Sequence, residues 1–258
     1  RGLYRSTNGG QSWEQVLFVS DQAGIIDMEM DPQNPDVLYA ASWDRIRNNQ
    51  QSIVSGPNGR IWKSTDGGDN WTMLTGGLPE VDMCRPGISI DKTNGQHLVA
   101  SYAGTNLSFE NVYETFDGGA NWEIMDQLDL ETGFQSSFAW YFGKIYINPY
   151  QPDDIWMLGV TSWRRPGTGS PWIEGAGFNQ DVHADHHALA FLGPGEALLG
   201  TDGGLYKTTD NGITWIKHEN IPCTQFYRVS WDPHSDVPAY YGGAQDNAKG
   251  KAHREEED

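Results

Sequence analysis

The sequence predicts an all-β repeat protein built from short strands in four-stranded antiparallel sheets. Two periodic patterns indicate this. An octet of the form Ser/Thr-x-Asp/Asn-x-Gly-x-x-Trp ends at Trp13, Trp71, Trp122 and Trp215, and each copy follows a short β-prone run. A second pattern, a strand, a Pro-containing turn and another strand, recurs at residues 25–41, 145–158 and 226–242. Two independent periodic signals in one chain favour a repeat architecture.

The octets have the chemistry of hairpin turns. The side chains of Asn8, Asp66, Asp117 and Asp210 can accept backbone N–H bonds from residues further along the turn, and the glycines supply positive φ angles. The tryptophan then begins the return strand and can pack a large ring on the neighbouring unit. We therefore assign these four Asn and Asp residues a structural role.

The spacing of the octets predicts a β-propeller. Trp13, Trp71, Trp122 and Trp215 are separated by 58, 51 and 93 residues. A propeller blade takes about 40–50 residues, so the last interval contains two blades, one of which has lost its octet. The chain holds about five blades' worth of sequence, which could close as a ring of five or form part of a larger ring.

Taken in order, the expected elements form one propeller over residues 1–247 and a tail. Residues 1–19 supply a partial blade, and residues 226–244 supply two strands of another. Between them lie four full blades at 24–75, 87–125, 138–174 and 182–218. The first full blade carries an insertion at 43–58 that we expect on a propeller face, and the third replaces the octet turn at 163–167. Residues 248–258 show no strand pattern and are expected to be disordered or a linker.

Composition excludes several classes of partner. The 258 residues carry a formal net charge of −18, which argues against nucleic acid and anionic membrane surfaces. No apolar run approaches the roughly 20 residues of a membrane span. Arg1 opens inside a repeat, without initiator Met or signal peptide, so we interpret the chain as part of a longer multidomain protein, with a processed form as the alternative. Cys84 and Cys223 are interpreted as free, buried thiols, with a disulfide as the alternative.

The octets resemble the Asp-box (BNR) repeats of β-propellers. Residues 31–45, 183–189, 200–204 and 242–247 are similar to the secreted bacterial proteins described as sortilin-like or as BNR-repeat glycosyl hydrolases. Relatives of these include the sortilin receptors and the xyloglucanases of glycoside hydrolase family 74. The resemblance implies an extracellular or cell-surface location. It does not define an activity, because one propeller architecture serves receptors, lectins and hydrolases.

Three sets of residues are candidates for function. If 183–187 is a strand, period-2 alternation puts His183, Asp185 and His187 on one face, where they could bind a metal or form a hydrogen-bonded cluster. A glycosidase needs paired carboxylates, for which we consider Asp27, Glu29 and Asp185. Ligand contacts are assigned to the following polar and aromatic residues: Trp43, Arg45, Trp163, Gln245 and Asp246.

These candidates support two main hypotheses. The first is an extracellular sortilin-like binding or scaffold module that presents one face to a protein or a glycan. The alternative is a glycoside hydrolase of the xyloglucanase type that acts on β-glucans through paired carboxylates. No cofactor is expected, and a structural metal ion at His183, Asp185 and His187 is the lesser alternative to a hydrogen-bonded cluster.

Overall fold

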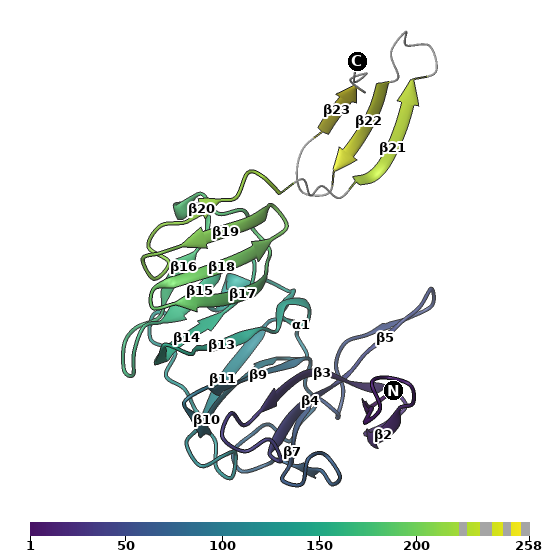
Figure 1. The fold of residues 1–258 in the computed structure, drawn as a ribbon, viewed down its shortest axis with the longest axis vertical. Coiled ribbons are helices and arrows are strands. Elements are labelled where there is room, and N and C mark those ends of the chain that lie inside the picture. Colours follow the sequence, from purple (N-terminus) through teal and green to yellow (C-terminus); the bar gives the residue numbers. More distant parts are fainter. Residues whose placement is uncertain (222–225, 233–238, 245–248, 254–258) are drawn as a thin grey trace.

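The structure, a computed structural model, describes residues 1–221, 226–232, 239–244 and 249–253. It contains four four-stranded antiparallel sheets in series, which confirms the predicted propeller architecture. Figure 1 shows these sheets following one another as a fan, with the chain ends β1–β2 and β21–β23 on either side of them. In the described part of the chain, no helix has the length and apolar character that a membrane crossing needs.

The strands of each sheet run in chain order. The first sheet holds β3 (Ala23–Met30), β4 (Leu38–Asp44), β7 (Arg60–Ser64) and β8 (Thr72–Met73). The second holds β9 (Pro86–Asp91), β10 (Asn94–Ala103), β11 (Phe109–Thr115) and β12 (Glu123–Ile124). The third holds β13 (Ile145–Asn148), β14 (Gln151–Met157), β15 (Ser162–Arg165) and β16 (Ile173–Ala176). The fourth holds β17 (His186–Gly193), β18 (Glu196–Thr201), β19 (Gly204–Thr208) and β20 (Ile216–Lys217).

Smaller elements complete the chain. β1 (Leu3–Arg5) pairs with β2 (Glu14–Leu17), and the insertion carries a hairpin of β5 (Ile46–Arg47) and β6 (Ser52–Ile53). One-turn helices lie at η1 (Thr132–Gln135), α1 (Ala139–Phe142) and η2 (Phe178–Gln180). The last sheet consists of β21 (Phe226–Asp232), β22 (Ala239–Ala244) and β23 (Lys249–His253).

The strand β23 corrects one prediction. Lys249–His253 lies in the segment predicted to be a disordered tail, yet it pairs antiparallel with β22 from Ala239 to Gly243. Main-chain hydrogen bonds along a sheet edge hold such a strand without any alternation of apolar side chains. The absence of a sequence pattern therefore did not indicate absence of structure here.

The octets at 64–71, 115–122 and 208–215 form the turns between the third and fourth strands of their sheets, and the octet at 6–13 joins β1 to β2. Asp66 Oδ1 accepts hydrogen bonds from Ser64 Oγ at 2.8 Å and from the Asn70 backbone N–H at 2.9 Å, while Oδ2 accepts from Asn70 Nδ2 at 2.7 Å. Asp117 makes the equivalent set with Thr115 and Asn121. Hydrogen bonds from Asn70 side chain and backbone lower the pKa of Asp66 to about 2, because they favour the ionised form.

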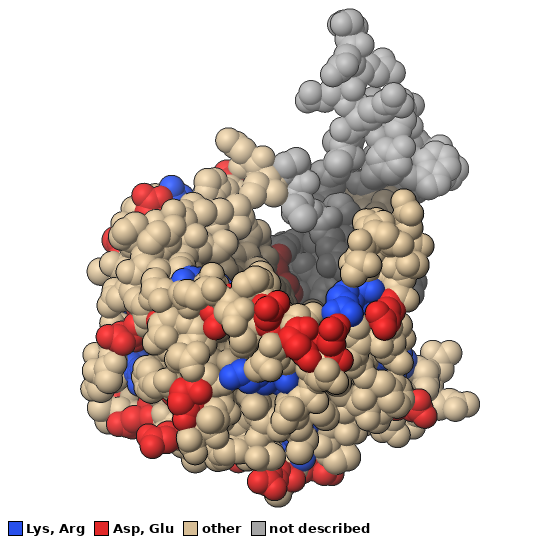
Figure 2. Space-filling view, turned by 60° about the horizontal axis from the view of Figure 1, so that its bottom comes forward, with Lys and Arg blue, Asp and Glu red and all other residues tan. Residues whose placement is uncertain are grey.

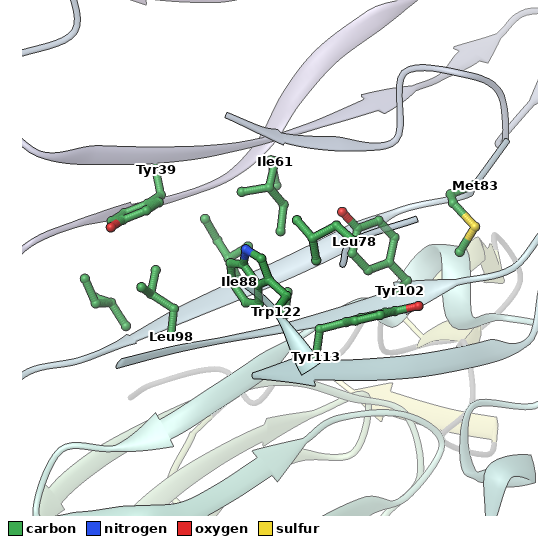
Figure 3. Close-up of a cluster of buried hydrophobic side chains, with 12 residues drawn as sticks. Tyr39, Ile61, Leu78, Met83, Ile88, Leu98, Tyr102, Tyr113 and Trp122 are labelled. Atoms are coloured by element: carbon green, nitrogen blue, oxygen red, sulfur yellow. The ribbon is translucent and has the colours of Figure 1, made fainter. Parts of the chain in front are cut away.

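The hydrophobic core is divided among the gaps between consecutive sheets. Figure 3 shows the first gap, where Tyr39 and Ile61 of one sheet meet Leu98 and Trp122 of the next. Equivalent clusters fill the second gap, around Phe109, Ile145 and Trp172, and the third, around Trp156, Leu199 and Trp215. The second and third sheets thus bury both of their faces against neighbours, and Trp122 and Trp215 of the octets are buried in these clusters.

Candidate functional site

One face of the propeller gathers the candidate functional residues. In every four-stranded sheet the first strand begins where the second strand ends, as the pairings Ala23 with Asp44 and Ile145 with Met157 show. The loops that precede the first strands and follow the second strands therefore lie at the same end of each sheet. We call this end the loop face. It carries residues 45–59, 104–108, 131–143 and 177–185.

An aromatic and cationic cluster crosses the loop face. The Cζ atom of Arg45 lies 5.6 Å from the ring centre of Trp43 and 5.2 Å from that of Trp140. Arg85 contributes from the next sheet, with Cζ 5.9 Å from the Trp43 ring and a hydrogen bond from Nη1 to the Tyr141 carbonyl. Cation–π contacts of this kind fix both partners. Three loops that are distant in sequence are thereby joined.

The cluster continues to His187 at the start of β17. Its ring stacks on Phe142 at 5.8 Å and meets the Tyr141 ring edge-on at 5.6 Å. Its Nε2 lies 2.7 Å from Asp202 Oδ1, and the Asp202 backbone N–H donates to the Asp185 carbonyl at 3.1 Å. The Asp202 carboxylate, the His187 imidazole and the exposed ring of Tyr141 therefore share one part of the loop face, with the backbone of Asp185 beside Asp202.

A shallow hollow adjoins this group. It encloses about 360 Å³, and its lining consists of Phe178, Asp181, Val182, His183, Ala184 and Tyr206. The Tyr206 hydroxyl accepts the His183 backbone N–H at 3.2 Å, which holds the segment before β17 in place. The exposed Phe178 ring supplies an apolar wall. A hollow with an apolar wall beside carboxylates is suited to a polar organic ligand.

The strand alternation predicted for 183–187 is wrong. β17 begins only at His186, and Asp185 adopts a left-handed backbone conformation with φ of 64°. Period-2 alternation therefore does not apply to His183 and Asp185. Within the described residues, no group of three or more His, Cys, Asp or Glu side chains is placed to hold a metal ion.

His186 is instead a structural histidine. It is fully buried between the third and fourth sheets, with Nδ1 2.6 Å from Ser162 Oγ and Nε2 2.9 Å from the His183 carbonyl. Burial lowers the pKa of His186 to about 4, because the charged imidazolium is poorly solvated there. The side chain is therefore neutral at physiological pH.

Asp27 and Glu29 lie in the seam between the first strands of two sheets. Asp27 Oδ2 accepts the Ile88 backbone N–H at 3.4 Å, and its Oδ1 lies 3.4 Å from Lys144 Nζ. Glu29 pairs with Lys92 at 2.7 Å, and burial raises the pKa of Glu29 in spite of that partner. Both carboxylates therefore contact residues of other blades.

The remaining candidates divide between the site and the core. Trp43 and Arg45 belong to the loop face, although the Trp43 side chain is buried and β4 includes it. Trp163 does not, because its ring packs against the core between the second and third sheets. Gln245 and Asp246 lie outside the described residues, as does Cys223. Cys84 is a free, buried thiol whose burial raises its pKa to about 11.

Sequence reasoning missed Arg85 and Asp202, and it did not place Tyr141, an aromatic candidate for sugar stacking, beside His187. Arg85 and Tyr141 occupy loops without a periodic pattern, and only the packing of adjacent blades brings them to His187. A local signal existed for Asp202, since it precedes Gly203-Gly204 much as the octet Asp residues precede glycine. That similarity indicates a turn at Asp202, but it does not predict the contact of Asp202 with His187 on another strand.

Comparisons with known proteins agree on a propeller. No family model matches the chain. A xyloglucanase of Paenibacillus sp is 26% identical over 246 residues, which cover 82% of this chain and 21% of the relative. The glycoside hydrolase family 74 xyloglucanase of Xanthomonas campestris superposes with a TM-score of 0.56 at 14% identity, over 88% of this chain and 35% of that one. The structure of YCF48 bound to D1 peptide superposes with a TM-score of 0.54 at 18% identity, over 99% of this chain and 71% of that one.

The chain spans about a fifth of the length of the curated relative and about a third of that xyloglucanase structure. At these identities the solved structures establish the fold. The similarity to the Paenibacillus xyloglucanase favours a glycoside hydrolase-like propeller over a sortilin-like one.

Proposed function

We propose that this chain is the propeller part of an extracellular glycoside hydrolase-like protein, and that its loop face binds a β-glucan chain. The observation that supports the proposal is that His187 links the Tyr141 ring to the Asp202 carboxylate on the loop face, beside the backbone of Asp185, in a chain similar to a xyloglucanase. Sugar rings present apolar faces to aromatic side chains and hydroxyl groups to carboxylates. The exposed Tyr141 ring and the two carboxylates meet both needs.

We also propose that this part of the loop face hydrolyses the glycan, with Asp202 as the base and Asp185 as the acid. The imidazole of His187 donates a hydrogen bond to Asp202, which orients this carboxylate as a base. Asp202 takes a proton from water as the water oxygen bonds to the anomeric carbon. Asp185 gives its proton to the glycosidic oxygen as the carbon–oxygen bond breaks. The reaction requires carboxylates on opposite sides of the bond, separated by about 5–10 Å.

Two assays test this proposal. Release of reducing ends from xyloglucan and mixed-linkage β-glucan measures hydrolysis, and affinity electrophoresis in the same polymers measures binding. We expect Asp202→Asn and Asp185→Asn to lower the rate at least 100-fold, the usual contribution of one acid or base, while binding persists. Tyr141→Ala should weaken binding about tenfold through the loss of ring stacking.

Asp153→Asn provides the matched control, because Asp153 is exposed and lies outside the loop face. It should leave both assays unchanged. Binding without hydrolysis in the wild-type chain would support a non-catalytic glycan-binding module and remove the catalytic assignment. A folded protein that neither binds nor cleaves these polymers would refute the proposal.

A further inference from the structure

The interfaces between blades share a basic residue that we call the latch. It lies near the end of β1, β7 or β15, opposite Glu14 for Arg5, Thr72 for Lys63 and Ile173 for Arg164. Each latch donates to a backbone carbonyl in the octet turn of the following blade. Arg5 Nη1 reaches Gly67 O at 3.1 Å, Lys63 Nζ reaches Gly118 O at 2.7 Å, and Arg164 Nη1 reaches Asn211 O at 2.6 Å.

One interface departs from this rule. Between the second and third sheets the latch position holds Glu114, opposite Glu123 in the register. The third sheet has no octet, and Arg165 stands where the other blades have the first octet residue, Ser or Thr. Glu114 Oε1 is 3.5 Å from Arg165 Nη2 and 3.0 Å from His97 Nε2. The sign of the charge has been reversed, and the turn that fills the other interfaces is missing.

A pocket of about 380 Å³ opens at this position. Its residues come from the second sheet and its octet turn, with Arg165 from the third sheet: Glu114, Thr115, Phe116, Asp117, Asn121, Glu123, Ile124, Met125, Asp126 and Arg165. Phe116 and Ile124 are 63% and 61% exposed, although both are large and apolar. The Phe116 ring is held in place by stacking on His97, with ring centres 4.6 Å apart. The volume lies within the range of ligand sites, about 300–1,000 Å³.

Arg165 brings to this pocket a buried hydrogen-bond donor that no described residue satisfies. The residue is 4% exposed, and its Nε is buried with no hydrogen-bond partner among the described residues. The long contact of Nη2 with Glu114 is the one hydrogen bond that its side chain makes within the described part of the chain. A buried guanidinium is normally satisfied by several acceptors. At the other interfaces the octet turn brings an acceptor carbonyl to the latch.

We propose that this pocket is a second carbohydrate site, which binds a neutral sugar residue. Four carboxylates line it, at Glu114, Asp117, Glu123 and Asp126, and they repel an anion. The guanidinium of Arg165 disfavours a cation near Glu114. A neutral polyhydroxylated ring satisfies both groups, because each hydroxyl can accept from Arg165 and donate to a carboxylate. The exposed Phe116 ring provides a stacking surface for the apolar face of the sugar.

This site is independent of the loop face. Its residues lie on the third and fourth strands and the octet turn, whereas the loop face is made by residues before the first strands and after the second strands. Glycan bound here would be held at the rim of the propeller. The inference therefore goes beyond the proposed function and does not depend on hydrolysis.

Nuclear magnetic resonance of the whole chain tests it, with cellotetraose as the probe. We expect cellotetraose to shift the backbone amide signals of residues 114–117 and 123–126 and the Nε–H signal of Arg165. Phe116→Ala should raise the dissociation constant measured from these signals about tenfold, the value of one lost ring contact. Phe18→Ala is the matched control, since Phe18 is also an exposed phenylalanine, 54% exposed, and lies outside the pocket.

Two further variants separate this proposal from the previous one. Tyr141→Ala should leave the shifts at 114–126 intact even if it abolishes binding at the loop face. Glu114→Gln should weaken the binding of cellotetraose in the pocket while the chain stays folded. Circular dichroism checks the fold of each variant. Unchanged signals at 114–126 with saturating cellotetraose would overturn the proposal, whatever the loop face does. Larger shifts there with spermidine or sulfate than with cellotetraose would also overturn it, because the site would then select a charged ligand.

Discussion

The interface between the first and second sheets is packed differently from the interface between the second and third sheets. Between the first and second sheets, Lys63 and the Tyr39 hydroxyl both donate to the Gly118 carbonyl, and Trp122 closes the core. Between the second and third sheets, Glu114 and Arg165 meet above an open pocket. The difference shows that an octet turn does more than reverse the chain. It also supplies the acceptor and the bulk that seal the next blade onto the previous one.

The two kinds of interface also differ in their histidines. His97 lies beneath the pocket, between Asp91 and Glu114. Burial alone would lower the pKa of His97, but these two carboxylates outweigh it and raise the pKa above its usual range. His186 lies between the third and fourth sheets, where an octet is present, and its pKa is lowered. Figure 2 shows that carboxylates also outnumber cations on the surface in view, as expected at a net charge of −18.

The largest effect is expected from the octet tryptophans. Trp122 is 5% exposed within the core between the first and second sheets, so Trp122→Ala should lower the free energy of unfolding by about 3–5 kcal/mol. Trp13 has the same place in its octet but is 63% exposed. Trp13→Ala should therefore cost less than about 0.5 kcal/mol. Equal losses in urea unfolding would show that the octet tryptophan stabilises its own turn and not the interface.

A smaller effect on the free energy of unfolding is expected when the pH is lowered and His186 is protonated. His186 has a folded-state pKa of about 4, below the unfolded value of about 6.5, so the unfolded state binds more protons between these values. Stability should fall as the pH falls from about 6.5 to 4, by about 3 kcal/mol in total from this group. His186→Gln should flatten the dependence, as measured by urea unfolding across that range.

The contribution of His97 to stability should depend on pH in the opposite direction, and His97→Gln provides the comparison. The folded-state pKa of His97 is raised, so its contribution to stability is fully present below the unfolded pKa and is lost as the pH rises through the folded one. The stability difference between wild type and His97→Gln should accordingly be larger at pH 6 than at pH 9. The same trend for both histidines would contradict the contrast between the two interfaces.

The smallest effect is expected from the latch. Lys63→Met should lower the free energy of unfolding by about 0.5–1.5 kcal/mol, the usual value of one hydrogen bond, because Gly118 O keeps its bond from Tyr39. Lys217→Met is the control, since Lys217 is exposed. Should the two variants be equally stable, the latch would be a consequence of packing and not a contributor to it.

The fold was predictable because its signals are local. The octets at Asp66, Asp117 and Asp210 identify their own turns through short-range hydrogen bonds, and their spacing fixes the repeat. The candidate site was less predictable, because its members come from different blades. Arg85, Tyr141 and His187 meet only when three successive blades pack, and no spacing along the chain encodes that meeting.

The incorrect predictions have the same origin. Alternation placed His183 with His187, but the positive φ of Asp185 ends the alternation before β17. Trp163 is a predicted ligand contact because it is aromatic, whereas its position in β15 packs the ring against the core. In both cases a single backbone conformation or strand register, which the sequence does not display, decided where the side chain points.

The seam along the first strands has a bearing on how the protein avoids aggregation. The Asp27 carboxylate accepts the backbone N–H of Ile88, and the Ser89 hydroxyl accepts that of Ile147. A strand edge with unused N–H groups is a template on which a foreign strand can grow. Here a side chain from the adjacent blade occupies these edge positions, so neighbouring blades protect each other from misassembly at the centre of the molecule.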